Sequence, residues 1–377
     1  MALLAIGLVT PGPAGATVGL QGTDTKHAGV TAAYVEPGPF AVGVTTLDLG
    51  DRKVEVWYPA NPKATAGKEP ESYFIRDRLP PAIAALLPAD INPPKATPAF
   101  RDIASSKRGP FPLVTFSHGA AGYREQSTFL TTHLASWGFV VASPEFLEFG
   151  LTGALGQRPA APRDEVEVLQ STVKVVREAS ASTPGVLSGL VRKGKIGAIG
   201  HSAGARASIE FAAADPSVAT YVALAGDVGG FGGASPEAPD IPSMYIAGRE
   251  DGIADLAGIE AYYRTVPTPK RLVVITGAGH LNAFSDICTI GEAGGGIIAI
   301  AQQAGLPVPS LVARLGTDGC FAPALPSADV QPVTKHYTTA QLRFALGLDK
   351  APVGLAPRSA NQFGAVDVAY STSTGRG

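Results

Sequence analysis

The sequence predicts an α/β fold, with a mostly parallel sheet of about eight strands, helices on both faces and two irregular insertions. Three observations support this prediction. From residue 111 to about residue 280, short apolar segments alternate with segments that have apolar residues at helical spacing. The apolar segments are continuous, which is typical of strands that are buried on both faces of a sheet. A chain of 377 residues is also long enough to bury a core of this size.

The composition excludes two other classes of protein. The chain has 30 Lys and Arg against 32 Asp and Glu, a net charge of −2, whereas nucleic-acid binding domains carry a basic surplus. Charged residues make up 16% of the chain and apolar residues 45%, a balance that excludes a disordered chain. The 45 glycines and 32 prolines follow no period and indicate many loops. We therefore expect a globular protein that binds no nucleic acid.

Residues 1–42 are expected to form a leader or arm. The apolar run 2–9 is too short for a membrane span, which needs about 20 residues. Residues 14–16 have the Ala-x-Ala form of a signal-peptidase site, so residues 1–16 are interpreted as a signal remnant. No basic residue precedes the apolar run, and a disordered leader is the alternative. The interpretation predicts an exported protein without a membrane span.

The folded domain is expected to span residues 43–350. It begins with an antiparallel hairpin at 44–58, followed by a proline-rich insertion at 61–110 with a helical patch at 81–87. Six further strands are expected, at 112–116, 139–142, 195–199, 219–224, 244–247 and 271–275. The helices expected between them lie at 127–137, 163–178, 203–214 and 253–266. A second insertion at 281–335, a helix at 338–348 and a tail at 351–377 complete the prediction.

A serine lies where an acyl-transfer nucleophile would be expected. The segment Gly200-His201-Ser202-Ala203-Gly204 matches the pattern G-x-S-x-G, between a predicted strand and a predicted helix. A sharp turn there would present the serine at the carboxyl edge of the sheet, where open α/β sheets bind ligands. The pattern is short, so this position between strand and helix carries the interpretation. The alternative is a tight turn whose serine caps the helix.

A serine hydroxyl needs a base, and the base needs a carboxylate to orient it. His280 follows the last predicted parallel strand, at the same edge of the sheet as Ser202, and is the predicted base. Structural or solvated roles are expected for His27, His118, His133 and His336, and His201, inside the turn, is expected to point away from the serine. Asp251 follows the preceding strand and is the predicted acid. Its competitors are Glu250, Asp255 and Asp227.

The developing oxyanion needs hydrogen-bond donors. The backbone N–H groups of Ala203, directly after the serine, and Ala120, in the loop after the first parallel strand, are the candidates. Phe146 and Phe149 follow the second parallel strand and are expected to line an apolar pocket, with core packing as the alternative.

Cys288 and Cys320 are the only cysteines, too few for a zinc site with four cysteine ligands. In an exported protein we expect them to form a disulfide that closes a loop of about 30 residues and stabilises the fold by about 3–4 kcal/mol. Two buried reduced thiols are the alternative. No motif for a metal or nucleotide cofactor is present, and none is expected.

Together these residues resemble the α/β-hydrolase superfamily. The stretch 112–144, with Ser117-His118-Gly119 and the segment 123–126, is similar to the dienelactone-hydrolase-like branch. That branch includes platelet-activating-factor acetylhydrolases and cutinase-type polyester hydrolases. The resemblance covers residues 44–60 and 110–285, and it implies the same nucleophile, acid, base and oxyanion donors. Dienelactone hydrolases themselves use a cysteine nucleophile, so their substrate is not implied here.

These observations predict a serine carboxylic-ester hydrolase that acts on neutral acyl esters through an acyl-enzyme, without a cofactor. The expected substrate is a small-molecule or polymeric ester. An extracellular polyester or aromatic-diester hydrolase with an open cleft is the alternative. A non-catalytic binding protein on the same fold is a further alternative, and the oligomeric state is left open.

Overall fold

The computed structural model describes residues 32–88, 92–226, 228, 235–291, 296–306, 308 and 310–374. The expected signal remnant, His27 and Asp227 lie outside these residues. In the part of the chain that is described, no helix is both long and apolar enough to cross a membrane.

Six parallel strands form the centre of the sheet, as the sequence predicts. They are β6 (Leu113–Ser117), β7 (Val140–Pro144), β8 (Ile196–His201), β9 (Val218–Leu224), β10 (Ser243–Gly248) and β11 (Lys270–Ile275). Every residue of β6, β7, β8 and β10 is buried. Burial on both faces explains why these segments are continuously apolar instead of alternating.

Four strands extend this centre, so the described residues form a sheet of ten strands and not about eight. The predicted hairpin is β1 (Ala41–Asp48) and β2 (Lys53–Ala60), and β2 pairs antiparallel with β7. The short strand β5 (Ala99–Arg101) joins the edge beside β1, and β12 (Val368–Ser373) pairs antiparallel with β11. The order across the sheet is β12-β11-β10-β9-β8-β6-β7-β2-β1-β5.

The expected tail at 351–377 therefore contains a strand of the sheet. Three of the six residues of β12, in the segment Val-Ala-Tyr-Ser-Thr-Ser, are not apolar, and five are at least partly exposed. An exposed edge strand has little apolar signal, which is why periodicity did not indicate it.

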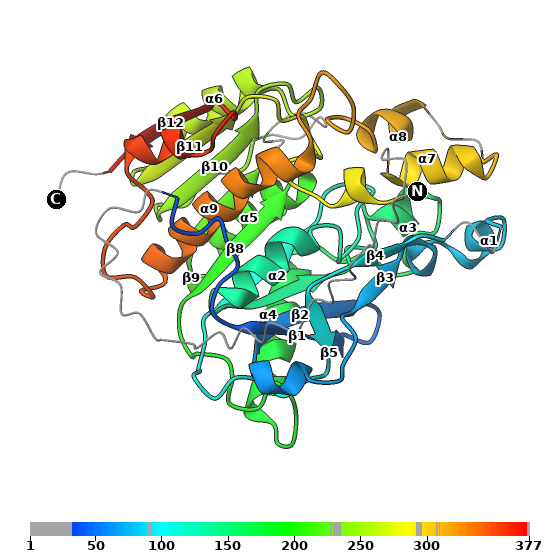
Figure 1. The fold of residues 1–377 in the computed structure, drawn as a ribbon, viewed down its shortest axis with the longest axis horizontal. Helices are drawn as coiled ribbons and strands as arrows, with labels where there is room; N and C mark the ends of the chain where they lie inside the picture. The colour runs from blue at the N-terminus through cyan, green and yellow to red at the C-terminus, as the bar shows by residue number, and fades with distance from the viewer. Residues whose placement is uncertain are drawn as a thin grey trace, which may run out of the picture. The chain divides into compact units, whose positions relative to one another are not determined.

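Helices cover both faces of the sheet (Figure 1). One face carries α2 (Thr128–Ser136) and α9 (Ser327–Ala345). The other carries α4 (Glu165–Ala181), α5 (Ala203–Ala214) and α6 (Leu256–Thr265). The helix α9 begins 11 residues before the predicted start at 338, because Pro332 inside it reads as a helix break in the sequence.

The two insertions carry short elements that lie on the same side of the sheet as the ends of β8 and β11 (Figure 1). The first holds a small sheet of β3 (Ser72–Phe74) and β4 (Pro94–Ala96), together with α1 (Pro81–Ala84). The second holds α7 (Gly296–Gln303) and α8 (Ser310–Leu315). Cys288 and Cys320 form the expected disulfide within it. A fourth short helix, α3 (Leu151–Ala154), follows β7.

Candidate active site

Ser202 lies in a strained turn between β8 and α5. Its φ of 55° and ψ of −121° fall in a backbone region that L-residues rarely adopt. The flanking glycines make the turn possible, because a Cβ at Gly200 would overlap the backbone of Gly204. A Cβ at Gly204 would in turn overlap the carbonyl oxygen of Ser117 at the end of β6. The local sequence therefore folds as the nucleophile elbow that the motif predicts.

The structure brings Ser202, His280 and Asp251 together at the carboxyl edge of the sheet. The Oγ atom of Ser202 lies 2.9 Å from Nε2 of His280. The Nδ1 atom of His280 lies 2.9 Å from Oδ2 of Asp251, and all three residues are buried. The N–H groups of Ile253 and Ala254 donate to Oδ1 of Asp251, each at 2.8 Å, and fix its carboxylate.

The competing carboxylates have other partners. Glu250 accepts a hydrogen bond from the N–H of Gly277 at 2.6 Å. Asp255 caps the start of α6 by accepting from the N–H of Gly258 at 3.1 Å. Among the described candidates, Asp251 is thus the carboxylate bound to the imidazole of His280.

The loop after β6 passes directly over the serine. A Cβ built on Gly119 would lie 3.2 Å from Cβ of Ser202, and Ala120 lines the cavity at the serine. Among the described residues, the N–H groups of Ala120 and Ala203 have no hydrogen-bond partner. Two free backbone donors beside a serine hydroxyl are what an oxyanion site requires.

A cavity of about 40 Å³ opens at Ser202. Its apolar wall consists of Leu151, Leu281, Ile287, Ile298, Val312 and Leu315. Phe146 and Phe149, the expected pocket residues, do not line it. Their rings stack at 4.9 Å and pack against His118 at 5.2 and 5.5 Å. Core packing, the alternative, describes Phe146 correctly, because its ring is fully buried in the main core.

The chain is similar to one known family and to a solved structure. The platelet-activating factor acetylhydrolase, isoform II family matches residues 84–151. No curated protein matches the chain. A solved structure of a ferulic acid esterase from Streptomyces cinnamoneus is similar, with a TM-score of 0.60 and 21% identity, over 90% of this chain and 99% of that chain. The chain has the α/β-hydrolase fold.

Two side chains whose contacts no sequence motif indicated, Gln126 and His201, link the parts of this site. Oε1 of Gln126 accepts from the N–H of Gly119 at 3.3 Å, and its Nε2 donates to Nδ1 of His201 at 2.9 Å. Nε2 of His201 donates to the carbonyl of His280 at 2.9 Å. Burial lowers the pKa of His201 well below its usual value, so the ring stays neutral. These hydrogen bonds join the loop after β6, which holds Ala120, to the loop after β11, which holds His280.

A carboxylate from the second insertion supports the other side of the site. Oδ1 of Asp318 accepts from the N–H of His280 at 2.6 Å, and Oδ2 accepts from the N–H of Gly252 at 3.1 Å. Asp318 lies two residues from Cys320, which the disulfide ties to Cys288. The insertion thus holds the loops of the predicted base and acid. No sequence motif indicates this role, because Asp318 is 38 residues from His280.

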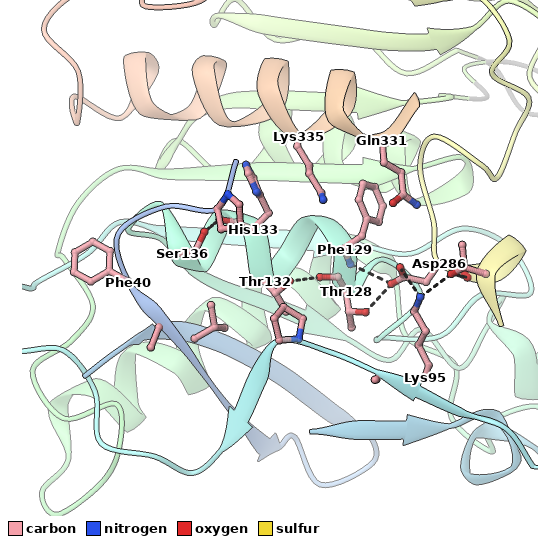
Figure 2. A pocket seen from close by; sticks show the side chains of 16 residues that line it. Phe40, Lys95, Thr128, Phe129, Thr132, His133, Ser136, Asp286, Gln331 and Lys335 are labelled. Atoms are coloured by element: carbon pink, nitrogen blue, oxygen red, sulfur yellow. Dashed lines mark hydrogen bonds and ion pairs between the residues drawn. The ribbon is translucent and has the colours of Figure 1, made fainter. Parts of the chain in front are cut away.

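A separate pocket of about 350 Å³, lined by both polar and apolar residues, lies beside α2 (Figure 2). There Asp286 accepts from Oγ1 of Thr128 at 2.6 Å and from the N–H of Phe129 at 3.1 Å, and pairs with Lys95 at 3.6 Å. Burial raises the pKa of the Asp286 carboxyl. The N–H of Asp286 donates to the carbonyl of Gln126 at 2.7 Å. These contacts anchor the backbone behind the active-site loops.

Proposed function

We propose that this α/β-hydrolase is a serine carboxylic-ester hydrolase that acts on neutral acyl esters through an acyl-enzyme. The observation that carries the proposal is the continuous set of hydrogen bonds from Ser202 through His280 to Asp251, beside the N–H groups of Ala120 and Ala203, which lack a hydrogen-bond partner among the described residues. A serine, a histidine and a carboxylate in this geometry form the arrangement that activates a serine hydroxyl for acyl transfer. A non-catalytic binding protein would not need this complete arrangement.

Each group has a defined task in the proposed reaction. Nε2 of His280 takes the proton from Oγ of Ser202 as the hydroxyl attacks the ester carbonyl. The carboxylate of Asp251 orients the ring and stabilises the imidazolium that forms. The N–H groups of Ala120 and Ala203 donate to the oxyanion. The imidazolium then protonates the leaving alcohol, and a water activated by the same histidine hydrolyses the acyl-enzyme.

Two further observations support an ester substrate, and the first of them favours an acyl group without charge. Among the described residues that line the cavity at Ser202 there is no Lys, Arg, Asp or Glu, so nothing there would pair with a charged acyl group. The family match and the structural relative are both named for carboxylic ester hydrolases, an acetylhydrolase and a ferulic acid esterase.

The name of the structural relative also favours a second candidate, an aromatic-ester or polyester hydrolase. The small volume of the cavity, about 40 Å³, and the walls that α3 and the second insertion contribute to it argue against a site that admits a polymer surface. Activity on soluble feruloyl esters and on insoluble polyester would separate these substrates from simple acyl esters.

The test is hydrolysis of p-nitrophenyl esters by the wild type and by Ser202→Ala. We expect the variant to lose about 10³-fold or more in kcat/KM. Ser208→Ala is the matched control, since Ser208 is a buried serine on α5 whose hydroxyl, among the described residues, donates a hydrogen bond to Oγ of Ser117 at 3.3 Å. Full activity in Ser202→Ala, or none in the wild type on any ester, would overturn the proposal.

We also infer that the chain folds in an oxidising compartment, outside the cytosol. The disulfide between Cys288 and Cys320 supports this, because such bonds persist in secreted proteins and are rare in reducing compartments. Thiol titration of unfolded protein from the producing cell should find no free thiol before reduction and two afterwards. Two free thiols before reduction would contradict export.

A further inference from the structure

We propose that the two insertions and α3 form a chamber for the acyl chain, so that preferred substrates carry an extended apolar acyl group. The inference rests on the proposed ester hydrolysis at Ser202 and assigns its substrate class. Its basis is a second cavity of about 190 Å³, separate from the pocket beside α2 that Figure 2 shows.

The walls of this chamber are apolar and come from segments far apart in the sequence. The first insertion contributes Leu79 and Ile83, and the second contributes Ala301 and Leu306. Arg76 is the one charged side chain among the described lining residues, and its guanidinium already donates to the carbonyls of Leu87 and Pro88. An apolar ligand is therefore the one that this lining would bind.

The chamber adjoins the reacting serine. Leu151, Ile298 and Val312 line both the chamber and the cavity at Ser202. Leu151 is also fixed to the loop after β6, because its N–H donates to the carbonyl of Gly122 at 2.7 Å. A chain attached to a carbonyl at Ser202 would thus pass these three side chains to enter the chamber.

The chemistry favours the acyl chain over the alcohol as the occupant. The acyl group becomes bonded to Oγ of Ser202 in the first half of the reaction and is released only when water hydrolyses the acyl-enzyme, whereas the alcohol leaves after the first half. A buried wall suits the part that is retained. Each methylene that the chamber buries should raise kcat/KM about fourfold, until the chain fills the available space.

The first test uses the wild type alone. Its kcat/KM is compared for p-nitrophenyl acetate, butyrate, hexanoate and octanoate, and for acetate esters of alcohols of increasing length. We expect a rise of at least tenfold from acetate to octanoate, with little dependence on the alcohol. A preference that follows the alcohol, or no dependence on acyl length, would overturn the chamber while leaving ester hydrolysis in place.

The second test fills the chamber. Ala301→Trp on α7 and Ile83→Trp on α1 place an indole in it from two different insertions. Each should lower the ratio of octanoate to acetate kcat/KM at least tenfold. Gln302→Trp is the matched control, since this exposed neighbour of Ala301 does not line the chamber, and its ratio should equal that of the wild type.

The outcomes are distinguishable. An unchanged ratio in a variant that melts like the wild type contradicts the chamber, and Ile83→Trp decides if Ala301→Trp fails to fold. A wild type that hydrolyses none of the esters would instead contradict the proposed function. A control that shifts the ratio as much as the two filled variants would also overturn the chamber.

Discussion

His336 should make the folded protein sensitive to acid, because both of its ring nitrogens are used in the neutral form. The residue lies on α9 and is fully buried. Its Nδ1 accepts from the N–H of Tyr34 at 3.2 Å, and its Nε2 donates to the carbonyl of Gly354 at 3.0 Å. Burial lowers the pKa of His336 from its ordinary 6.5 to about 4.

The sign and size of the effect follow from this pKa. The unfolded chain binds a proton at His336 below pH 6.5, whereas the folded protein does so only near pH 4. The stability that the neutral, buried His336 contributes to the fold is therefore fully present above pH 6.5, and it is lost as the pH falls from 6.5 to about 4. The loss is about 2 kcal/mol at pH 5 and about 3 kcal/mol below pH 4.

Urea unfolding of the wild type and of His336→Gln at pH 7.5 and pH 5.0 checks this prediction. The side chain of glutamine can donate and accept hydrogen bonds but does not titrate. The free energy of unfolding that is lost between the two pH values should be about 2 kcal/mol smaller in the variant. His133, whose pKa burial lowers to about 3, contributes equally to both proteins and cancels. An equal loss in wild type and variant would refute the reasoning.

Three further predictions concern the supports of the site. Asp318→Ala removes the acceptor of two backbone N–H groups and should lower kcat at least about tenfold, with a smaller change in KM. Asp318→Asn should lower kcat less. Equal kinetics in the wild type and both variants would contradict a positioning role for Asp318. Gly204→Ala should destabilise the folded protein by about 3 kcal/mol or more, because the new Cβ meets the backbone at the end of β6. Gly258→Ala on α6 has space for a Cβ and should be neutral or stabilising. Melting temperatures of the two variants test this, and equal shifts in melting temperature would refute the steric argument. Replacing Cys288 and Cys320 together by serine removes a disulfide between residues 32 apart and should lower the free energy of unfolding in urea by about 3–4 kcal/mol. The prediction fails if the double variant unfolds like the wild type.

The positions of Ser202, Asp251 and His280 could be predicted because each follows a continuously apolar strand. Parallel strands bring their carboxyl ends to one edge, so residues 29 and 78 apart in the chain meet there. The α/β-hydrolase fold is confirmed, while the catalytic roles of these residues stay a prediction. The elbow was predictable for a similar reason, since only glycine fits at Gly200 and Gly204.

Other features could not be read from the sequence. Asp318 and Gln126 each make two hydrogen bonds to backbone or ring atoms of residues that are not their neighbours in sequence, and such contacts leave no periodic pattern. The predicted pocket residues Phe146 and Phe149 lie on the expected loop, but their rings turn toward His118. Which way a loop side chain turns depends on its tertiary neighbours, and local sequence does not contain that information.

The pairing of β12 with β11 has a consequence for how this protein is made. About 90 residues separate the end of β11 from the start of β12, so a ribosome needs about 5–20 s to supply the second strand after the first. During that interval the outer edge of β11 presents unpaired N–H and C=O groups, which are templates for pairing with other nascent chains. Slow translation over this stretch would lengthen the exposure, and deletion of residues 368–373 would make it permanent. Yield of soluble protein should therefore depend on this strand more than its few buried side chains suggest.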